Sequence, residues 1–232
     1  MPSPFSALPR FGRGSFWLFV VVAAASAFVS DLPVARLLHL GPPFVGELAL
    51  WQPLSAPFLF PEGQLGGLVG TGLLQWFVGS PVEARLGTAR YLGLVFGGAV
   101  LGYLALGLLG LAVPAALTHP QGGSTPIDIA AVAAFGLAFA REPVSVFGVL
   151  PVTARGFAGV AAALLLLGPL LRDGWPAVVP GLIAGLFAVL LARRWRKAPA
   201  SGKVGPRGGG GTGKPKRPRH LRIVDGREQY LN

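Results

Sequence analysis

The sequence predicts an all-α fold: a polytopic membrane protein in which six transmembrane helices pack as a bundle. First, 52% of its 232 residues are hydrophobic and only 12% are charged, whereas a soluble domain carries about 25% charged residues. Second, apolar runs recur at about the 17–25 residues that a helix needs to cross the hydrocarbon core. Third, Lys and Arg gather between these runs on one side, as they do in cytoplasmic loops.

Six candidate helices follow from the apolar runs. They cover residues 14–30, 63–82, 91–127 (a span with a loop), 127–140, 156–171 and 174–192. The first run, which follows Arg10 and Arg13, also fits a cleaved signal peptide, but its length and the later spans favour an uncleaved helix. Residues 31–62 form the one longer loop, and no room is left for a large soluble domain.

The Lys and Arg residues before residue 193 divide unequally between the two sides of the predicted bundle. Six lie on the side of both termini and two on the other: Arg10, Arg13, Arg85, Arg90, Arg141 and Arg155 against Arg36 and Arg172. Because positive loops stay on the cytoplasmic side, we expect both termini to be cytoplasmic. The predicted location is multi-pass, in the cytoplasmic membrane of a bacterial-type cell.

The net charge of +11 belongs mainly to the C-terminal end of the chain. Twelve of the twenty Lys/Arg and two of the nine Asp/Glu follow residue 192, so the preceding body is nearly neutral. We therefore divide the chain into a membrane domain, residues 1–197, and a basic, Gly/Pro-rich, disordered cytoplasmic tail, residues 198–232. The tail contacts anionic lipid headgroups, RNA or an acidic protein partner, or is simply solvated. A folded basic face for nucleic acid is not expected.

Glycines recur at four-residue spacing within the predicted spans. The pairs are Gly66 and Gly70, Gly93 and Gly97, Gly98 and Gly102, and Gly181 and Gly185. Small residues at this spacing let two helix backbones approach closely in lipid. We therefore expect the second, third and sixth helices to be buried against one another.

Metal and thiol chemistry have little support in the sequence. Cys is absent, and the three His are His39 and His119 in predicted outer loops and His220 in the tail. Because no span contains a His or Cys, an intramembrane metal site built on them is excluded. We expect no metal and no cofactor.

Ser124 is the candidate nucleophile. It follows two glycines at the outer start of the fourth helix, where backbone N–H groups gather. Asp128 lies one turn further on the same face, and an acidic group within a span is a functional candidate. A structural interpretation competes, because Thr125 as N-cap, Pro126 as first helical residue and Asp128 as third make a capping box. The capping interpretation accounts for every residue of this segment and is favoured for Asp128.

Five segments in order resemble the rhomboid family of intramembrane serine proteases over roughly residues 48–192. They are WQPLS (51–55), GSPVEARLG (79–87), GGS (122–124), FGVLPV (147–152) and GLIAGL (181–186). The resemblance implies a six-helix, rhomboid-like bundle with a water-filled site that opens outward. It also implies cleavage of transmembrane substrates by a Ser on the fourth helix, activated by a His on the sixth.

The catalytic pattern that the resemblance implies is largely missing. Ser124 matches the nucleophile, but Thr125 replaces the glycine after it, and Val178 occupies the His position. Gly67 and Thr71 occupy the positions of a His and an Asn that help to hold the oxyanion, and only Thr71 keeps a polar side chain. A Ser hydroxyl without a base is a weak nucleophile, and loss of the base costs about 10⁴–10⁶ in rate.

Two functions remain open. The first is a non-catalytic pseudoprotease that sits in the lipid bilayer and binds transmembrane helices of client proteins. The alternative is an active rhomboid protease with Ser124 as nucleophile and a non-standard base, either His119 or Asp128. A transporter is disfavoured, because charges within the spans are few and inverted repeats are not evident.

Overall fold

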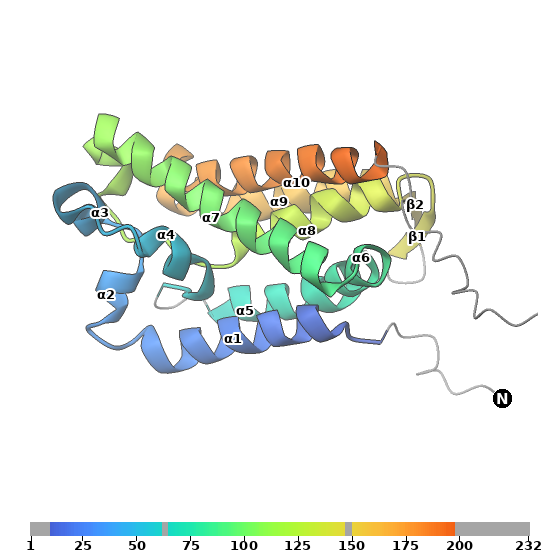
Figure 1. Ribbon diagram of the computed structural model, residues 1–232, viewed down its shortest axis with the longest axis horizontal. Coiled ribbons are helices and arrows are strands. Elements are labelled where there is room, and N and C mark those ends of the chain that lie inside the picture. The colour runs from blue at the N-terminus through green and yellow to red at the C-terminus, as the bar shows by residue number, and fades with distance from the viewer. Residues whose placement is uncertain (1–9, 62–64, 147–149, 198–232) are drawn as a thin grey trace, which may run out of the picture. The chain divides into compact units, whose positions relative to one another are not determined.

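A computed structural model describes residues 10–61, 65–146 and 150–197 of the chain. The described residues form one compact unit that is mostly helical (Figure 1), so the predicted all-α class is correct. Its longer helices are α1 (Arg13–Val29), α5 (Leu65–Leu74), α7 (Thr88–Ala112), α8 (Thr125–Ala138), α9 (Ala154–Asp173) and α10 (Val179–Lys197). The predicted tail, residues 198–232, lies outside the described residues.

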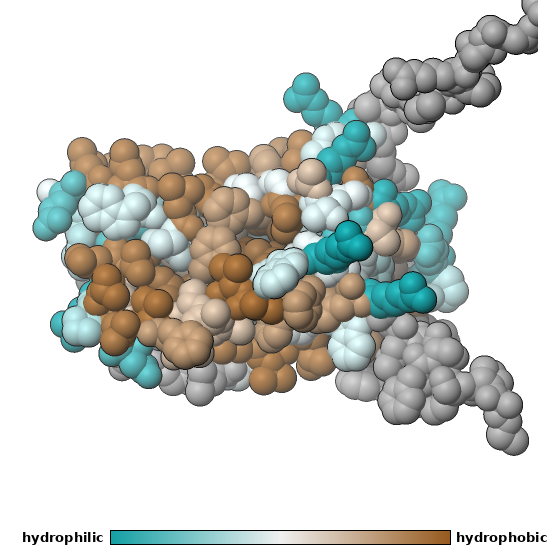
Figure 2. Space-filling model, turned by 60° about the horizontal axis from the view of Figure 1, so that its bottom comes forward, coloured by the Kyte–Doolittle hydropathy of each residue, from teal (hydrophilic) through white to brown (hydrophobic). Residues whose placement is uncertain are grey.

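Among the described residues, three helical segments are long and apolar enough to cross a membrane. They are α7, α9 and the stretch Trp175–Trp195, which joins the 3-10 turn η5 (Trp175–Val178) to α10. The helices α1 and α8 are apolar but shorter. Figure 2 shows a broad hydrophobic band on one face, with hydrophilic residues at both ends of the bundle. These features indicate a membrane protein.

The predicted second helix is continuous but not uniform. It consists of α5, the π-helical turn η3 (Gln75–Gly79) and α6 (Ser80–Leu86). A π turn inserts one extra residue into the helix and so rotates the faces on either side of it, and such turns often occur at functional sites. The turn begins at Gln75, a buried polar residue.

Close packing of α7 on α10 follows from two glycines of α7. A Cβ at Gly98 would lie 3.2 Å from the Ala184 carbonyl oxygen, and one at Gly102 would collide with the backbone of Pro180. Since a Cβ is excluded at Gly102 and would be tight at Gly98, the two backbones approach as the four-residue spacing predicts. The predicted contact between the third and sixth helices is therefore confirmed.

The glycine pairs of α10 and α5 do not mediate the contacts expected from their spacing alone. Gly181 and Gly185 of α10 face Ile129 of α8, so α10 also packs on the fourth helix. A Cβ at Gly66 or Gly70 of α5 would meet no atom within 4 Å. The expectation that these two glycines bury the second helix is therefore wrong, because they line open space rather than a helix contact.

The connection after α1, expected to be a long loop over residues 31–62, contains several short helices. It contains α2 (Ala35–Leu38), α3 (Pro42–Glu47), α4 (Gln52–Ser55) and the 3-10 turn η2 (Ala56–Phe58). Leu40 and Phe44 from this segment are buried in an apolar cluster with residues of α7 and of η4 (Pro114–Leu117). The segment between α1 and α5 therefore packs against the end of the bundle.

A short β-hairpin, which the sequence analysis does not predict, links α8 to α9. Its strands β1 (Pro143–Val146) and β2 (Leu150–Thr153) pair antiparallel, with Val144 opposite Val152. Residues 147–149, part of the fourth of the five segments above, lie outside the described residues. After the hairpin, the Thr153 hydroxyl caps α9 by accepting the Gly156 N–H at 3.1 Å.

Candidate functional site at Ser124

Hydrogen bonds to its backbone from three other segments of the chain hold the loop before α8. Leu40 and Gln121 exchange N–H···O bonds of 2.9 and 2.7 Å, and the Gly123 N–H donates to the Ala56 carbonyl at 3.0 Å. The Tyr103 hydroxyl donates to the Gly123 carbonyl at 2.8 Å. Gly123 has φ +106°, a value that side chains disfavour, so a glycine is required directly before Ser124. The loop places Ser124 in a fixed position.

The start of α8 differs from the predicted capping box. The helix begins at Thr125 with Ser124 as N-cap, and the N-cap makes no side-chain cap hydrogen bond. The Asp128 N–H instead donates to the Ser124 carbonyl at 3.0 Å. The capping interpretation of Thr125 and Asp128 is therefore wrong, and the Asp128 side chain points to other partners.

Four buried polar side chains meet where α8 contacts α5 and η3. The Thr71 and Ser124 hydroxyl oxygens lie 2.5 Å apart, and Thr71 donates to Asp128 Oδ2 at 2.7 Å. Gln75 Nε2 donates to Asp128 Oδ1 at 3.0 Å. Ser124 also lies within reach of Asp128 Oδ2, at 3.3 Å. The predicted common face of Ser124 and Asp128 is thus confirmed, and we call these four residues the Ser124 cluster.

The proton positions in this cluster follow from counting donors. A Thr has one hydroxyl proton, and the 2.7 Å bond gives that of Thr71 to Asp128. The Ser124 proton then points to the Thr71 oxygen, since 2.5 Å is shorter than the 3.3 Å to Asp128. The direct partner of the Ser124 proton is therefore a hydroxyl, which is a very weak base.

The cluster continues through Gln75 toward the other end of the bundle. The Tyr91 hydroxyl donates to Gln75 Oε1, and the Ser15 side chain is also a hydrogen-bond partner of Tyr91. Gln75 is not among the site residues predicted from the sequence. The sequence pattern that could have identified Gln75 is its spacing from Thr71. Thr71 and Gln75 are four residues apart, as are Ser124 and Asp128, and these two polar pairs meet on facing helices.

A second buried carboxylate, Glu83, lies at the far end of this chain of contacts. It accepts the backbone N–H groups of Gly14 and Ser15 at 2.8 Å each, and the hydroxyls of Ser15 at 3.0 Å and Thr88 at 2.7 Å. Burial raises the pKa of Glu83, but the hydrogen bonds from Thr88, Ser15 and Gly14 outweigh it and hold the pKa below its ordinary value. We call this set the Glu83 cluster.

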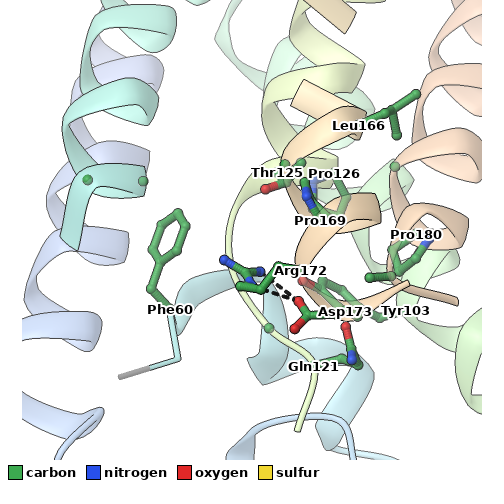
Figure 3. A pocket seen from close by; sticks show the side chains of 16 residues that line it. Phe60, Tyr103, Gln121, Thr125, Pro126, Leu166, Pro169, Arg172, Asp173 and Pro180 are labelled. Carbon is green, nitrogen blue, oxygen red and sulfur yellow. Dashed lines mark hydrogen bonds and ion pairs between the residues drawn. The ribbon is translucent and has the colours of Figure 1, made fainter. Parts of the chain in front are cut away.

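A cavity of about 320 Å³ lies beside the Ser124 cluster. Its walls come from the start of α5, the loop before α8, the end of α9 and the start of α10. Figure 3 shows Arg172 and Asp173 projecting into it as an ion pair, with 2.8 Å between Arg172 Nη2 and an Asp173 oxygen. Thr125 lines the cavity, whereas Ser124 does not and is fully buried.

The other positions named by the resemblance hold no base. Val178 lies in η5 and is not a lining residue of the cavity, whereas its neighbour Ala177 is. A Cβ at Gly67 would collide with the ring of Phe60, which fills the space beside α5. His119 is exposed, and Ser124 has no hydrogen bond to it among the described residues. His119 is therefore not positioned as the base that the alternative function allows.

Neither a metal site nor a relative of known function identifies the role of this site. Among the described residues there is no group of three His, Cys, Asp or Glu that could hold a metal ion. No family model matches the chain, and a search of curated proteins finds no relative.

Proposed function

We propose that this chain is a rhomboid-like, six-span membrane protein without protease activity that binds transmembrane helices of other proteins. The direction of the helices supports six spans, since α1, α5–α6, α7, α8, α9 and α10 run alternately between the two ends of the bundle (Figure 1). Exposed apolar side chains support contact with lipid. Val160 and Leu164 of α9, for example, are 63% and 64% exposed.

The distribution of charge supports an orientation with both termini in the cytoplasm of a bacterial-type cell. The α6 end of the bundle carries Arg85 and Arg90, and α10 ends there with Arg193 and Arg194, all of them exposed. Among the described residues, the opposite end carries two exposed arginines, Arg36 and Arg172, and Arg172 pairs with the half-buried Asp173. Positive residues gather on the cytoplasmic side of membrane proteins.

Burial of Ser124 is the observation that carries the non-catalytic assignment. A nucleophile must reach its substrate, and a base must take its proton. Ser124 is 0% exposed, and its hydroxyl lies against Thr71 at 2.5 Å. With Val178 in place of a His, the hydroxyl serves as a structural donor, and the neighbouring cavity remains as a place to hold a client segment.

Photocrosslinking tests client binding. A photoreactive amino acid at Leu166, which lines the cavity, is expected to crosslink to transmembrane segments that mass spectrometry identifies. The matched control is Leu164, two residues away on the same helix and 64% exposed. Equal yields at the two positions would mean random contact in the bilayer and would refute a client site at the cavity.

The orientation has its own test, because the sequence contains no Cys. A membrane-impermeant maleimide is expected to label Glu47→Cys in intact cells and Arg141→Cys only after permeabilisation. Both positions are exposed. The reverse pattern would invert the proposed topology without bearing on Ser124.

A second candidate function, an active protease with Asp128 as base, is favoured by one distance. Asp128 Oδ2 lies 3.3 Å from the Ser124 hydroxyl, within reach of a general base. This function requires Ser124 to become exposed and to turn its proton away from Thr71. Cleavage of a panel of transmembrane substrates by the wild type, lost in both Ser124→Ala and Asp128→Asn, would establish it.

A further inference from the structure

A second cavity lies at the arginine-rich end of the bundle, between α6, α7, α8 and α10. Its volume is about 240 Å³. Two arginines, Arg85 and Arg90, contribute to its lining, and the remaining walls are apolar. The apolar lining residues include Leu86, Leu137, Ala138, Ala192 and Trp195. The cavity thus combines cationic groups with a hydrophobic wall.

The two arginines differ in how far they are neutralised. Arg85 Nη1 lies 3.4 Å from Glu142, and its guanidinium lies 4.9 Å from the centre of the Phe139 ring. Arg85 and Glu142 are 50% and 60% exposed, so their attraction is weak. In the part of the chain that the structure describes, no carboxylate lies within 4.0 Å of the Arg90 guanidinium. Arg90 is therefore available for an anion.

The surroundings of the cavity add positive charge. Arg141 and Arg155 line a neighbouring pocket that also contains Glu142, and Arg193 and Arg194 are exposed near the end of α10. Of the acidic groups that the structure describes on this side, the other one, Glu83, is buried with its donors and does not line the cavity. An anion is thus favoured here over a cation or a neutral polar group.

We infer that this cavity binds an anionic phospholipid of the cytoplasmic leaflet. Arg85 and Arg90 contact the headgroup phosphate, and an acyl chain lies along the apolar wall beside Trp195. Three features point to a lipid rather than a soluble anion: the apolar lining, the position at the end of the membrane-compatible helices α7 and α10, and the presence of the Trp195 indole in the lining. Basic pockets between transmembrane helices bind lipid headgroups in this way, and Trp favours the membrane interface. The inference rests on the proposed membrane orientation but not on the state of Ser124.

The test is equilibrium binding of phosphatidylglycerol to the full-length protein in detergent micelles, followed by native mass spectrometry, with phosphatidylcholine as neutral competitor. Arg90→Gln is expected to weaken phosphatidylglycerol binding about fivefold, and replacement of both arginines by Gln more than about tenfold. Arg90→Lys keeps the charge and most of the affinity. The matched control, Arg36→Gln, removes an arginine from the opposite end and leaves binding within about twofold.

A cavity-filling variant separates a defined site from general surface charge. Ala138→Leu leaves every charge in place but occupies the cavity, and it is expected to weaken binding at least about threefold. Unchanged binding in Ala138→Leu, or equal losses in Arg90→Gln and Arg36→Gln, would overturn the site. Displacement of the lipid by millimolar inorganic phosphate would overturn a lipid ligand in favour of a free anion. Absence of client crosslinking at Leu166 would leave these results intact, so the two proposals fail separately.

Discussion

Two buried carboxylates stand out among the described residues, and one is held by backbone N–H groups whereas the other is held by side chains alone. Glu83 is 5% exposed and faces the start of α1, where the N–H groups of Gly14 and Ser15 have no carbonyl partner within the helix. Its remaining donors are the hydroxyls of Ser15 and Thr88. The carboxylate therefore does the work of an N-cap from another helix, and backbone geometry fixes its place.

Asp128 has no backbone donor to its side chain among the hydrogen bonds of the described residues. It is 2% exposed, the side chains of Thr71 and Gln75 donate to it, and the Ser124 hydroxyl lies 3.3 Å from its Oδ2. Neutral side chains can turn or be replaced, whereas helix N–H groups cannot. The Glu83 cluster is therefore an anchor of the fold, while the Ser124 cluster is an adaptable network that holds a serine out of solvent.

The largest expected effect is that of Glu83→Gln. The amide retains one acceptor oxygen and points an NH₂ group at donors, so two or more charge-assisted bonds are lost. We expect a loss of about 3 kcal/mol in the free energy of unfolding, measured by denaturation in detergent micelles. The control Glu142→Gln removes the exposed pair with Arg85 and is expected to cost less than about 1 kcal/mol. Equal losses would abolish the distinction of Glu83 as an anchor.

Asp128→Asn is expected to cost less, about 1–2 kcal/mol in the same measurement. The Asn oxygen can still accept from Thr71, and the amide of Gln75 can turn to present its oxygen. A loss greater than that of Glu83→Gln would contradict the adaptable character of the Ser124 cluster.

The third prediction concerns pH. Because the pKa of Glu83 is lowered in the folded protein, the unfolded chain binds a proton at higher pH than the folded one. The stabilisation is therefore present above the ordinary carboxyl pKa and is lost as pH falls through the lowered value. Between about pH 6 and about pH 3, the wild type is expected to lose more thermal stability than Glu83→Gln. If the melting temperatures of the wild type and of Glu83→Gln change equally with pH across this range, Glu83 is not the source of the pH dependence.

The smallest expected effect is that of Thr71→Val, which keeps the shape of the side chain and removes its hydroxyl. Ser124 can then donate to Asp128 directly, so only about 1 kcal/mol is expected to be lost. Thr118→Val is a control at an exposed site and should be nearly neutral. A loss above about 3 kcal/mol would place Thr71 among the anchors.

The sequence predicts the helices well because one physical quantity, the length of an apolar run, largely determines them. The predicted run 14–30 corresponds to α1 at Arg13–Val29, and the run 156–171 to α9 at Ala154–Asp173. The hairpin before α9 is missed, since two four-residue strands are too short for a period to show.

The site is predicted only in part, because side-chain partners depend on how each helix is rotated. The four-residue spacing places Ser124 and Asp128 on one face, as observed. It cannot show that this face meets Thr71 and Gln75, because a π turn starts at Gln75 and helix rotation is set by packing. The capping box failed for a similar reason, since buried donors on α5 and η3 compete with the helix N-terminus for Asp128.

The central claim is that the Ser124 hydroxyl is a structural donor and not a nucleophile. Its most direct test is labelling of the purified full-length protein by a fluorophosphonate probe, with Ser124→Ala measured in parallel. We expect labelling of the wild type to equal the background of the variant, because Ser124 is fully buried and its proton faces Thr71. Stoichiometric labelling of the wild type that disappears in Ser124→Ala would contradict the claim.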